Sequence, residues 1–156
     1  MTGTPPVSER NTQVATYANI THIQGDLFES NTSLCHCVSS DLSFGKGIAK
    51  SFRDRYGGED QLQEQPHQIG DTPYLERDGI VIFYLVTKKL YHQKPTYDSI
   101  EKSLETMRDI MIQKHIHDIS MPRIGCGLDK KNWTEIEKIL GRVFKDTDIK
   151  ISVYSL

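Results

Sequence analysis

The sequence predicts an α/β domain in which a largely parallel sheet lies between layers of helices. Short apolar runs rich in β-branched residues alternate along the chain with stretches of helical periodicity. This alternation is typical of strands joined by crossover helices. Residues 80–86 form a continuous apolar run, which is typical of a central strand buried on both faces. Sheets of this kind bind their ligands at the carboxyl ends of the strands.

The first half of the chain is expected to supply three strands and one helix. Strands are predicted at 17–23, 34–38 and 80–87. Residues 59–73 are polar and predict a partly helical connector. A helix is predicted at 47–56, because apolar residues repeat there at every fourth position: Ile48, Phe52 and Tyr56.

A long helix is predicted after Thr96, whose hydroxyl is a suitable N-cap. Asp98 falls in the first turn, where a negative charge complements the helix dipole. One face of this helix is apolar, as expected for core packing. The residues of that face are Tyr97, Ile100, Leu104, Met107 and Met111.

The chain is expected to close with a strand, a helix and a second strand. The strand is predicted at 118–121, and the last strand at 149–153 has an alternating apolar pattern. Between them, Asn132 with Glu135 three residues later has the spacing of a capping box. The apolar stripe of this helix comprises Trp133, Ile136, Leu140, Val143 and Phe144.

Length and composition predict one compact domain, at 17–156, preceded by a disordered tail at 1–16. The chain has 156 residues, of which 37% are hydrophobic and 26% are charged. A net charge of −2 argues against a protein that grips long nucleic acids by their backbone. No apolar stretch approaches the roughly 20 residues that span a bilayer, and the polar residues 1–13 do not resemble a signal peptide.

Neither the cysteines nor the histidines predict a metal site. Cys35, Cys37 and Cys126 are expected to be free thiols in a reducing compartment, with Cys35 and Cys37 as small buried residues. No second Cys/His pair follows at zinc spacing. The six histidines show no catalytic spacing with a carboxylate or cysteine and are expected on strands or on the surface: His22, His36, His67, His92, His115 and His117.

Residues 120–129 have a Gly-x-Gly pattern directly after a predicted strand, with Arg123 before it and Asp129 after it. Gly125 and Gly127 are expected to adopt positive φ, so that successive N–H groups converge on phosphate oxygens. Turns use the same residues for conformational reasons alone, so this loop by itself is a weak signal.

A second glycine loop strengthens that hypothesis. Residues 43–52 follow the strand at 34–38 and open a helix, so that free N–H groups and the positive end of the helix dipole meet there. The loop lacks the third glycine of the dinucleotide fingerprint and the Gly-Lys-Ser/Thr of a P-loop. Two glycine loops that each end a strand indicate a pyrophosphate held between them.

The strand at 80–87 delivers Lys88 and Lys89 to the same edge of the sheet. In one interpretation both are solvated lysines that mark the end of the strand. In the other, Lys88 lies in a cleft, where the loss of water favours a neutral amine that can act as a nucleophile. Spacing alone favours the first interpretation.

Taken together, several segments resemble the terminal ADP-ribose protein glycohydrolases, a family of stand-alone macrodomains that includes O-acyl-ADP-ribose deacylases. The resemblance covers about residues 17–156, and its most specific motifs are Thr87-Lys88-Lys89 and the loop 121–129. Other macrodomains carry an asparagine pair after the second strand. This chain has Val38-Ser39-Ser40 at that position and so differs from them. The other matching segments are 24–28, 36–39, 45–49, 84–86, 92–97 and 146–151.

The resemblance implies a three-layer α/β/α sandwich around a mixed, largely parallel sheet. It also implies an enzyme without a cofactor or metal that removes mono-ADP-ribose from acidic side chains of proteins and deacylates O-acyl-ADP-ribose. Lys88 would attack the anomeric carbon of the distal ribose, and Asp129 would resolve the lysyl adduct.

The same resemblance implies a set of substrate-binding residues. Asp26 would accept a hydrogen bond from the adenine amino group, with Leu27 against the base, and Leu156 would close the pocket. Lys46 stands where the family has a small neutral residue, and the segment between Asp26 and Cys35 is about two residues shorter than in the family. The site for ribose and phosphates would be lined by Ser39, Gly45, Gly47, Ile48, Ala49, Pro122, Arg123, Ile124, Gly125, Cys126, Gly127 and Leu128.

Three functions remain open at this point: the glycohydrolase, a non-catalytic ADP-ribose-binding module, and a hydrolase of ADP-ribosylated nucleic acid. The expected partners are ADP-ribose and ADP-ribosylated proteins, with ADP-ribosylated DNA as the alternative and no membrane. The third function requires a basic surface, for which the candidates are Lys46, Lys50, Arg53 and Arg55, although these are also typical of a solvated helix face. The protein is expected to be a monomer in the nucleus and cytoplasm, with a role in the DNA damage response.

Overall fold

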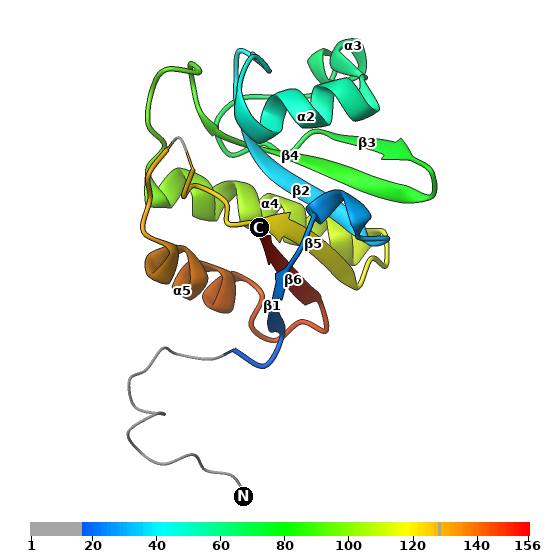
Figure 1. Cartoon of the computed structure of the whole chain (residues 1–156), viewed down its shortest axis with the longest axis vertical. Helices are drawn as coiled ribbons and strands as arrows, with labels where there is room; N and C mark the ends of the chain where they lie inside the picture. The colour runs from blue at the N-terminus through cyan, green and yellow to red at the C-terminus, as the bar shows by residue number, and fades with distance from the viewer. Residues whose placement is uncertain (1–16, 128) are drawn as a thin grey trace, which may run out of the picture.

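The computed structural model describes residues 17–127 and 129–156, and shows a sheet with helices on both faces (Figure 1). The expected tail and Leu128 lie outside the described residues. Within them, no helix is both long and apolar enough to cross a bilayer. The elements are β1 (Ile20–Gln24), the short 3-10 helix η1 (Leu27–Glu29), β2 (Ser33–Ser39), α2 (Gly47–Tyr56), α3 (Glu59–Gln63), β3 (Tyr74–Arg77), β4 (Ile80–Lys88), α4 (Tyr97–Gln113), β5 (Asp118–Pro122), α5 (Trp133–Val143) and β6 (Lys150–Ser155).

The sheet has six strands in the order β1-β6-β5-β2-β4-β3. Every neighbouring pair is parallel except β3 with β4, which is antiparallel. The mixed, largely parallel sheet between helical layers confirms the predicted fold class. Because five strands run in parallel, their carboxyl ends meet at one edge of the sheet.

Strand β3 was not predicted from the sequence. Its signal is the Asp78-Gly79 pair between two β-rich runs. Asp78 has φ of +53° and Gly79 has φ of +83°, as a two-residue turn with both central residues left-handed requires. The turn pairs β3 with β4 as a hairpin, from Arg77 opposite Ile80 to Tyr74 opposite Phe83.

Strand β4 divides the hydrophobic core into two parts. Phe83 and Leu85 face the core under α4 and α5, whereas Ile82 and Tyr84 face the core under α2 and α3. Both faces of the strand are therefore buried, which accounts for its continuous apolar sequence. The predicted apolar face of α2 is only partly correct, because Phe52 is fully buried but Ile48 remains 36% exposed at the first turn.

Two helix N-termini follow the predicted caps. The Thr96 hydroxyl accepts a hydrogen bond from the Ser99 N–H, and the Ser99 hydroxyl accepts one from the Thr96 N–H, which closes a capping box. The Asn132 side chain accepts from the Thr134 N–H. The capping-box spacing predicted that the Asn132 N–H would donate to Glu135, but it donates to the Tyr97 hydroxyl instead. This hydrogen bond joins the N-termini of α4 and α5 at the carboxyl edge of the sheet.

His36 lies in the core between β2 and α2, on a strand as predicted. Its ring stacks on Phe52 with centroids 3.8 Å apart and meets Tyr84 edge-on at 4.7 Å. Both ring nitrogens are buried without a hydrogen-bond partner among the described residues. Burial lowers the pKa of His36 to about 3, with the backbone at Cys37 acting weakly in the opposite direction. His36 is therefore neutral in the folded protein.

We expect the protein to lose stability between pH 7 and pH 5 because of His36. The unfolded chain takes up a proton near pH 6.5 while the folded chain does not, so unfolding becomes more favourable as the pH falls below 6.5. The loss should amount to about 2 kcal/mol between pH 7 and pH 5. Urea unfolding of the native chain and His36→Phe at both pH values measures it. His92→Phe, at an exposed position, is the control, and an equal pH dependence in all three proteins would contradict the assignment.

Candidate active site

The carboxyl edge of the sheet collects the residues that the sequence singled out. The parallel register places Ser39 at the end of β2 opposite Lys88 at the end of β4. Pro122 at the end of β5 lies opposite Tyr154 of β6, and Gln24 at the end of β1 lies opposite Ser155. The loops after β1, β2, β4 and β5 therefore border one surface.

The sheet opens at this edge between β2 and β5. These strands pair only through Ser33 with Ile119 and Leu34 with Ser120, at the amino ends of both. Pairing stops there, although β2 continues to Ser39 and β5 to Pro122. The chain also reverses its direction across the sheet here, since β4 follows on one side of β2 and β5 on the other. Such a topological switch point is where open α/β sheets bind ligands.

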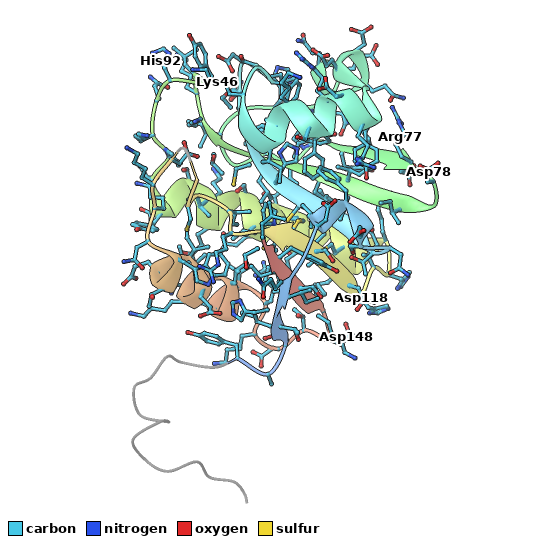
Figure 2. All side chains as sticks on the ribbon, viewed as in Figure 1. Lys46, Arg77, Asp78, His92, Asp118 and Asp148 are labelled. Atoms are coloured by element: carbon cyan, nitrogen blue, oxygen red, sulfur yellow. The ribbon has the colours of Figure 1, made fainter. Side chains whose placement is uncertain are left out.

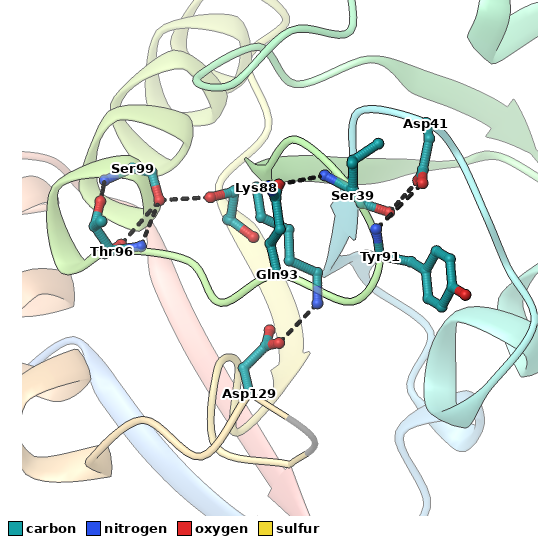
Figure 3. Close-up of polar contacts among 10 residues, drawn as sticks. Ser39, Asp41, Lys88, Tyr91, Gln93, Thr96, Ser99 and Asp129 are labelled. Carbon is teal, nitrogen blue, oxygen red and sulfur yellow. Dashed lines mark hydrogen bonds and ion pairs between the residues drawn. The ribbon is translucent and has the colours of Figure 1, made fainter.

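Lys88 and Asp129 form an ion pair at this opening (Figure 3). Lys88 Nζ donates to Asp129 Oδ1 at 2.8 Å, although 41 residues separate the two in the sequence. Each side chain is only 14% exposed. The interpretation of Lys88 as a solvated lysine is therefore wrong, whereas Lys89 is exposed.

A β-bulge sets the position of Lys88. Val38 pairs with Val86, but the next residue of β2, Ser39, pairs with Lys88, so Thr87 has no partner in β2. Bulges of this kind bend a strand and redirect the side chain that follows. The Ser99 hydroxyl at the start of α4 donates to the Thr87 carbonyl at 2.6 Å, and the Ser40 N–H donates to the Lys88 carbonyl at 2.8 Å. Lys88 is thus held by backbone contacts on both sides.

Asp41 joins the loops after β2 and β4, and sequence reasoning missed it. Its carboxylate accepts hydrogen bonds from the Ser39 hydroxyl and from the N–H groups of Ser43 and Tyr91. Partial burial acts to raise the pKa of Asp41, but these hydrogen bonds outweigh it and the pKa is lowered. The signal in the sequence is an aspartate directly after a strand. Such an aspartate can accept a hydrogen bond from the N–H two residues later, which forms an Asx turn.

The two glycine loops follow β2 and β5 and border the same edge of the sheet. Gly125 has φ of +75° and Gly47 has φ of +61°, both in the left-handed region. Gly127 does not adopt positive φ, contrary to the sequence prediction. A Cβ added at Gly45 or Gly127 would meet no atom within 4 Å, so packing within the described residues does not require glycine at either position.

The start of α2 has no side-chain cap. Lys46 occupies the N-cap position without a side-chain hydrogen bond to the helix, and Gly47, Ile48 and Ala49 form the first turn. The first N–H groups of a helix have no partner within the helix and attract anions. Lys46, which stands where the resembled family has a small neutral residue, is exposed.

The loop at 123–127 is anchored by the core and by neighbouring residues. Ile124 is 2% exposed and packs in the core under α4 and α5, while Cys126 is partly buried. The Arg123 guanidinium is exposed and lies 5.8 Å from the centre of the Trp133 ring. The Lys131 N–H donates to the Gly125 carbonyl at 2.6 Å and closes the turn.

The residues expected at the adenine end differ in exposure. Asp26 is exposed, and its Oδ1 accepts from the Phe28 N–H at 2.9 Å, which caps η1. Leu27 is 5% exposed and packs into the core under α2. Leu156 is 98% exposed at the end of β6, and the C-terminus lies at the carboxyl edge of the sheet (Figure 1).

Other charged clusters lie away from this edge or are already paired. His22 contacts Glu137 at 2.6 Å on the β1 side. Across 17–127 and 129–156, no three His, Cys, Asp or Glu side chains come together as a metal site would require. A surface hollow also runs along the second half of α4, past Thr106 and Gln113, away from the Lys88–Asp129 pair.

Known structures with the same architecture define the class of the fold. The macrodomain of DarG from Mycobacterium tuberculosis superposes with a TM-score of 0.78 at 25% identity, over 88% of this chain and 97% of that one. DarTG from Thermosipho africanus, solved in complex with ADP-ribose, gives a TM-score of 0.78 at 19% identity, over 88% of this chain and 41% of that one. The fold is a macrodomain.

Sequence similarity identifies the branch. The chain is 45% identical to ADP-ribose glycohydrolase OARD1 of Homo sapiens over 141 residues, which cover 89% of this chain and 93% of the human protein. No protein-family model matches the chain. The chain belongs to the family of ADP-ribose glycohydrolase OARD1, which confirms the resemblance seen in the sequence.

We expect Asp41→Ala to loosen the two loops that Asp41 joins. The variant leaves the N–H groups of Ser43 and Tyr91 without their carboxylate acceptor, and should cost about 1–2 kcal/mol of stability. Amide hydrogen exchange of these two N–H groups should become at least about tenfold faster. Asp109→Ala, at an exposed carboxylate on α4, is the control. Unchanged protection in Asp41→Ala would show that the loops do not depend on this carboxylate.

Proposed function

We propose that this protein is an ADP-ribosyl hydrolase that removes mono-ADP-ribose from acidic side chains of proteins, with Lys88 as the nucleophile. The observation that carries the proposal is the largely enclosed contact between Lys88 Nζ and Asp129 Oδ1 at the opening of the sheet. The relationship to an ADP-ribose glycohydrolase supports the activity. The ADP-ribose bound to a structural neighbour supports the ligand.

The order of the strands gives the direction of the bound ligand. Asp26 follows β1 at one side of the sheet and Lys88 ends β4, four strands away. At about 4.8 Å per strand, the two ends lie about 19 Å apart across the sheet, which suits an extended ligand. In this proposal adenine lies at Asp26, the pyrophosphate lies between the two glycine loops, and the distal ribose lies at Lys88.

The site binds phosphate through its backbone and a local positive charge. The first turn of α2 and the loop 123–127 offer N–H groups. Lys46 is exposed and lies, with His92, at the end of the molecule that holds this edge (Figure 2). This local charge favours the approach of an anionic ligand despite the net charge of −2.

The first chemical step replaces the ester by a bond to lysine. Lys88 Nζ gives one proton to solvent, and its lone pair then attacks the anomeric carbon of the distal ribose, while Asp129 stays ionised. A bond forms between Nζ and that carbon, and the bond from the carbon to the ester oxygen breaks. The side-chain carboxylate of the target leaves with the electron pair.

The second step returns lysine to its resting form. The ring C–O bond of the adduct breaks as its oxygen takes a proton from Nζ, which leaves an iminium, and water then loses a proton to Asp129 and adds to the iminium carbon. Asp129 returns that proton to Nζ. The carbon–nitrogen bond breaks with its electron pair going to Nζ, the hydroxyl proton passes to Nζ, and the carbon becomes the aldehyde of ADP-ribose. Free ADP-ribose leaves, and the Lys88–Asp129 ion pair forms again. The same two steps release a carboxylic acid from O-acyl-ADP-ribose, so we include that substrate class.

The basic surface required for a nucleic-acid substrate has weaker support. Of its four candidates, Lys50 contacts Asp54 at 2.8 Å and Arg53 contacts it at 3.5 Å. Arg55 lies 4.4 Å from the centre of the Phe28 ring. These three charges already have partners on the protein, as expected for the solvated face of a helix. ADP-ribosylated DNA therefore remains the second candidate substrate.

We further propose an intracellular location, in the nucleus and cytoplasm. Three free cysteines within the described residues suit a reducing compartment. Burial raises the pKa of Cys35 well above its usual value and that of Cys37 to about 12, so both thiols stay protonated. Neither is reactive in the folded protein.

Lys88→Ala is expected to lower the release of ADP-ribose from a glutamate-linked mono-ADP-ribosylated protein by on the order of a thousandfold, because the nucleophile is lost. Binding of ADP-ribose should be retained. Asp129→Ala should accumulate a covalent adduct, seen by intact-mass spectrometry as one added ADP-ribosyl group.

Lys89→Ala is the matched control, because it removes an exposed lysine from the adjacent position and should keep full activity. Equal turnover in Lys88→Ala and the native chain would rule out the lysine mechanism. If the native chain binds ADP-ribose but releases none, the protein is a binding module or acts on another linkage.

Gly45→Ala and Gly127→Ala are expected to weaken ADP-ribose binding while leaving thermal stability nearly unchanged. The added methyl group meets no protein atom within 4 Å, but it occupies the space where phosphate oxygens would lie. Loss of one close contact predicts a roughly tenfold rise in Kd. Calorimetric titration with ADP-ribose measures it. An unchanged Kd in both variants would place the pyrophosphate elsewhere.

A further inference from the structure

The connection between β4 and α4 exposes a tyrosine beside the Lys88–Asp129 pair. Tyr91 is 58% exposed and follows Lys88 by three positions, and its neighbour Leu90 is 36% exposed. Among the described residues, only the C-terminal Leu156 is a more exposed large hydrophobic residue. Tyrosine has an apolar ring and a polar tip, and it is enriched where proteins contact other molecules.

This exposure does not come from a loose loop. The Tyr91 N–H donates to Asp41 Oδ2 at 3.2 Å, and the Asp41 N–H donates to the Lys89 carbonyl at 3.2 Å. The Leu90 N–H donates to the Gln93 side chain at 2.8 Å, and the Gln93 N–H returns to the Leu90 carbonyl at 3.0 Å. The Tyr91 ring is therefore presented from a fixed backbone (Figure 3).

The location of Tyr91 is not one that ADP-ribose itself fills under the proposed function, on which this inference rests. The nucleotide runs across the sheet from β1 to β4 and ends with its distal ribose at Lys88. The leaving group is attached to that ribose, and it extends past the nucleophile. The β4–α4 connection, which carries Leu90 and Tyr91, follows Lys88 directly along the chain, and Asp41 ties it to the loop after β2.

We propose that Tyr91 is a specificity-determining residue that contacts the polypeptide bearing the ADP-ribose. Tyrosine offers a large and rigid apolar face at low entropic cost, and it is enriched where proteins bind other polypeptides. The Tyr91 and His92 rings are in T-shaped contact, with centroids 5.3 Å apart and an interplanar angle of 81°. A polypeptide fits this surface better than a nucleic acid does, because three of the four candidate cations on α2 are already engaged within the protein.

The test compares two substrates that share ADP-ribose and differ in the leaving group. One is a peptide carrying glutamate-linked mono-ADP-ribose, and the other is O-acetyl-ADP-ribose, whose leaving group is too small to reach Tyr91. Tyr91→Ala should lower kcat/KM for the peptide about tenfold, the effect of losing one well-placed aromatic contact. Its kcat/KM for O-acetyl-ADP-ribose should stay within about twofold of the native value, and Tyr91→Phe, which keeps the ring, should retain activity on both.

Ile112→Ala is the control for loss of an exposed apolar side chain, since Ile112 is 53% exposed on α4, away from this edge. An equal fall on both substrates in Tyr91→Ala would assign the ring a structural role in holding Lys88 and would overturn the proposal. No change on either substrate, or a fall confined to an ADP-ribosylated oligonucleotide, would also overturn it. If the native chain releases ADP-ribose from neither substrate, the proposed function itself fails and this inference falls with it.

Discussion

Parallel pairing of five strands is the constraint on which the rest of this structure depends. It requires every strand to enter from the same side, so all five strands end at one edge and their loops meet there. The α4 and α5 crossovers that this pairing imposes bury one face of the sheet, and α2 and α3 bury the other. Two irregularities in this sheet then form the site. The bulge between Val38 and Ser39 sets the position of Lys88, and the pairing of β2 with β5 ends early, after Leu34 and Ser120.

Under the proposed function, the site relies on backbone geometry for its ligand and on few side chains for its chemistry. Glycine loops and the uncapped start of α2 supply N–H groups, which bind anions without a large positive charge. This is compatible with a slightly acidic protein. The proposed chemistry is assigned to Lys88 and Asp129, and the loops that carry them are held by Asp41, Ser99 and Lys131 through hydrogen bonds to backbone groups. Binding and chemistry thus depend on different parts of the same edge.

Local sequence patterns predicted most of the fold, because they depend on nearby residues. The period of the apolar residues predicted α4 and α5, and the caps at Thr96 and Asn132 formed as expected. The misses have physical reasons. Strand β3 has only four residues and depends on its turn more than on its pattern, and the role of Asp41 lies in joining two loops that are distant in sequence. The left-handed conformation expected of Gly127 was not required, since Gly125 alone makes the turn.

The sequence by itself determined the α/β class, the family and the edge of the sheet at which the candidate site residues lie, since motif and periodicity are properties of short segments. Only the tertiary structure decided what Lys88 is. Its spacing in the sequence alone favours the interpretation as a solvated lysine at the end of a strand, like Lys89. In the folded chain it is largely enclosed and paired with Asp129, 41 residues away. Burial and ion pairing arise from segments that meet only when the sheet forms, so spacing and composition could not distinguish the two lysines, although the family resemblance singled out Lys88.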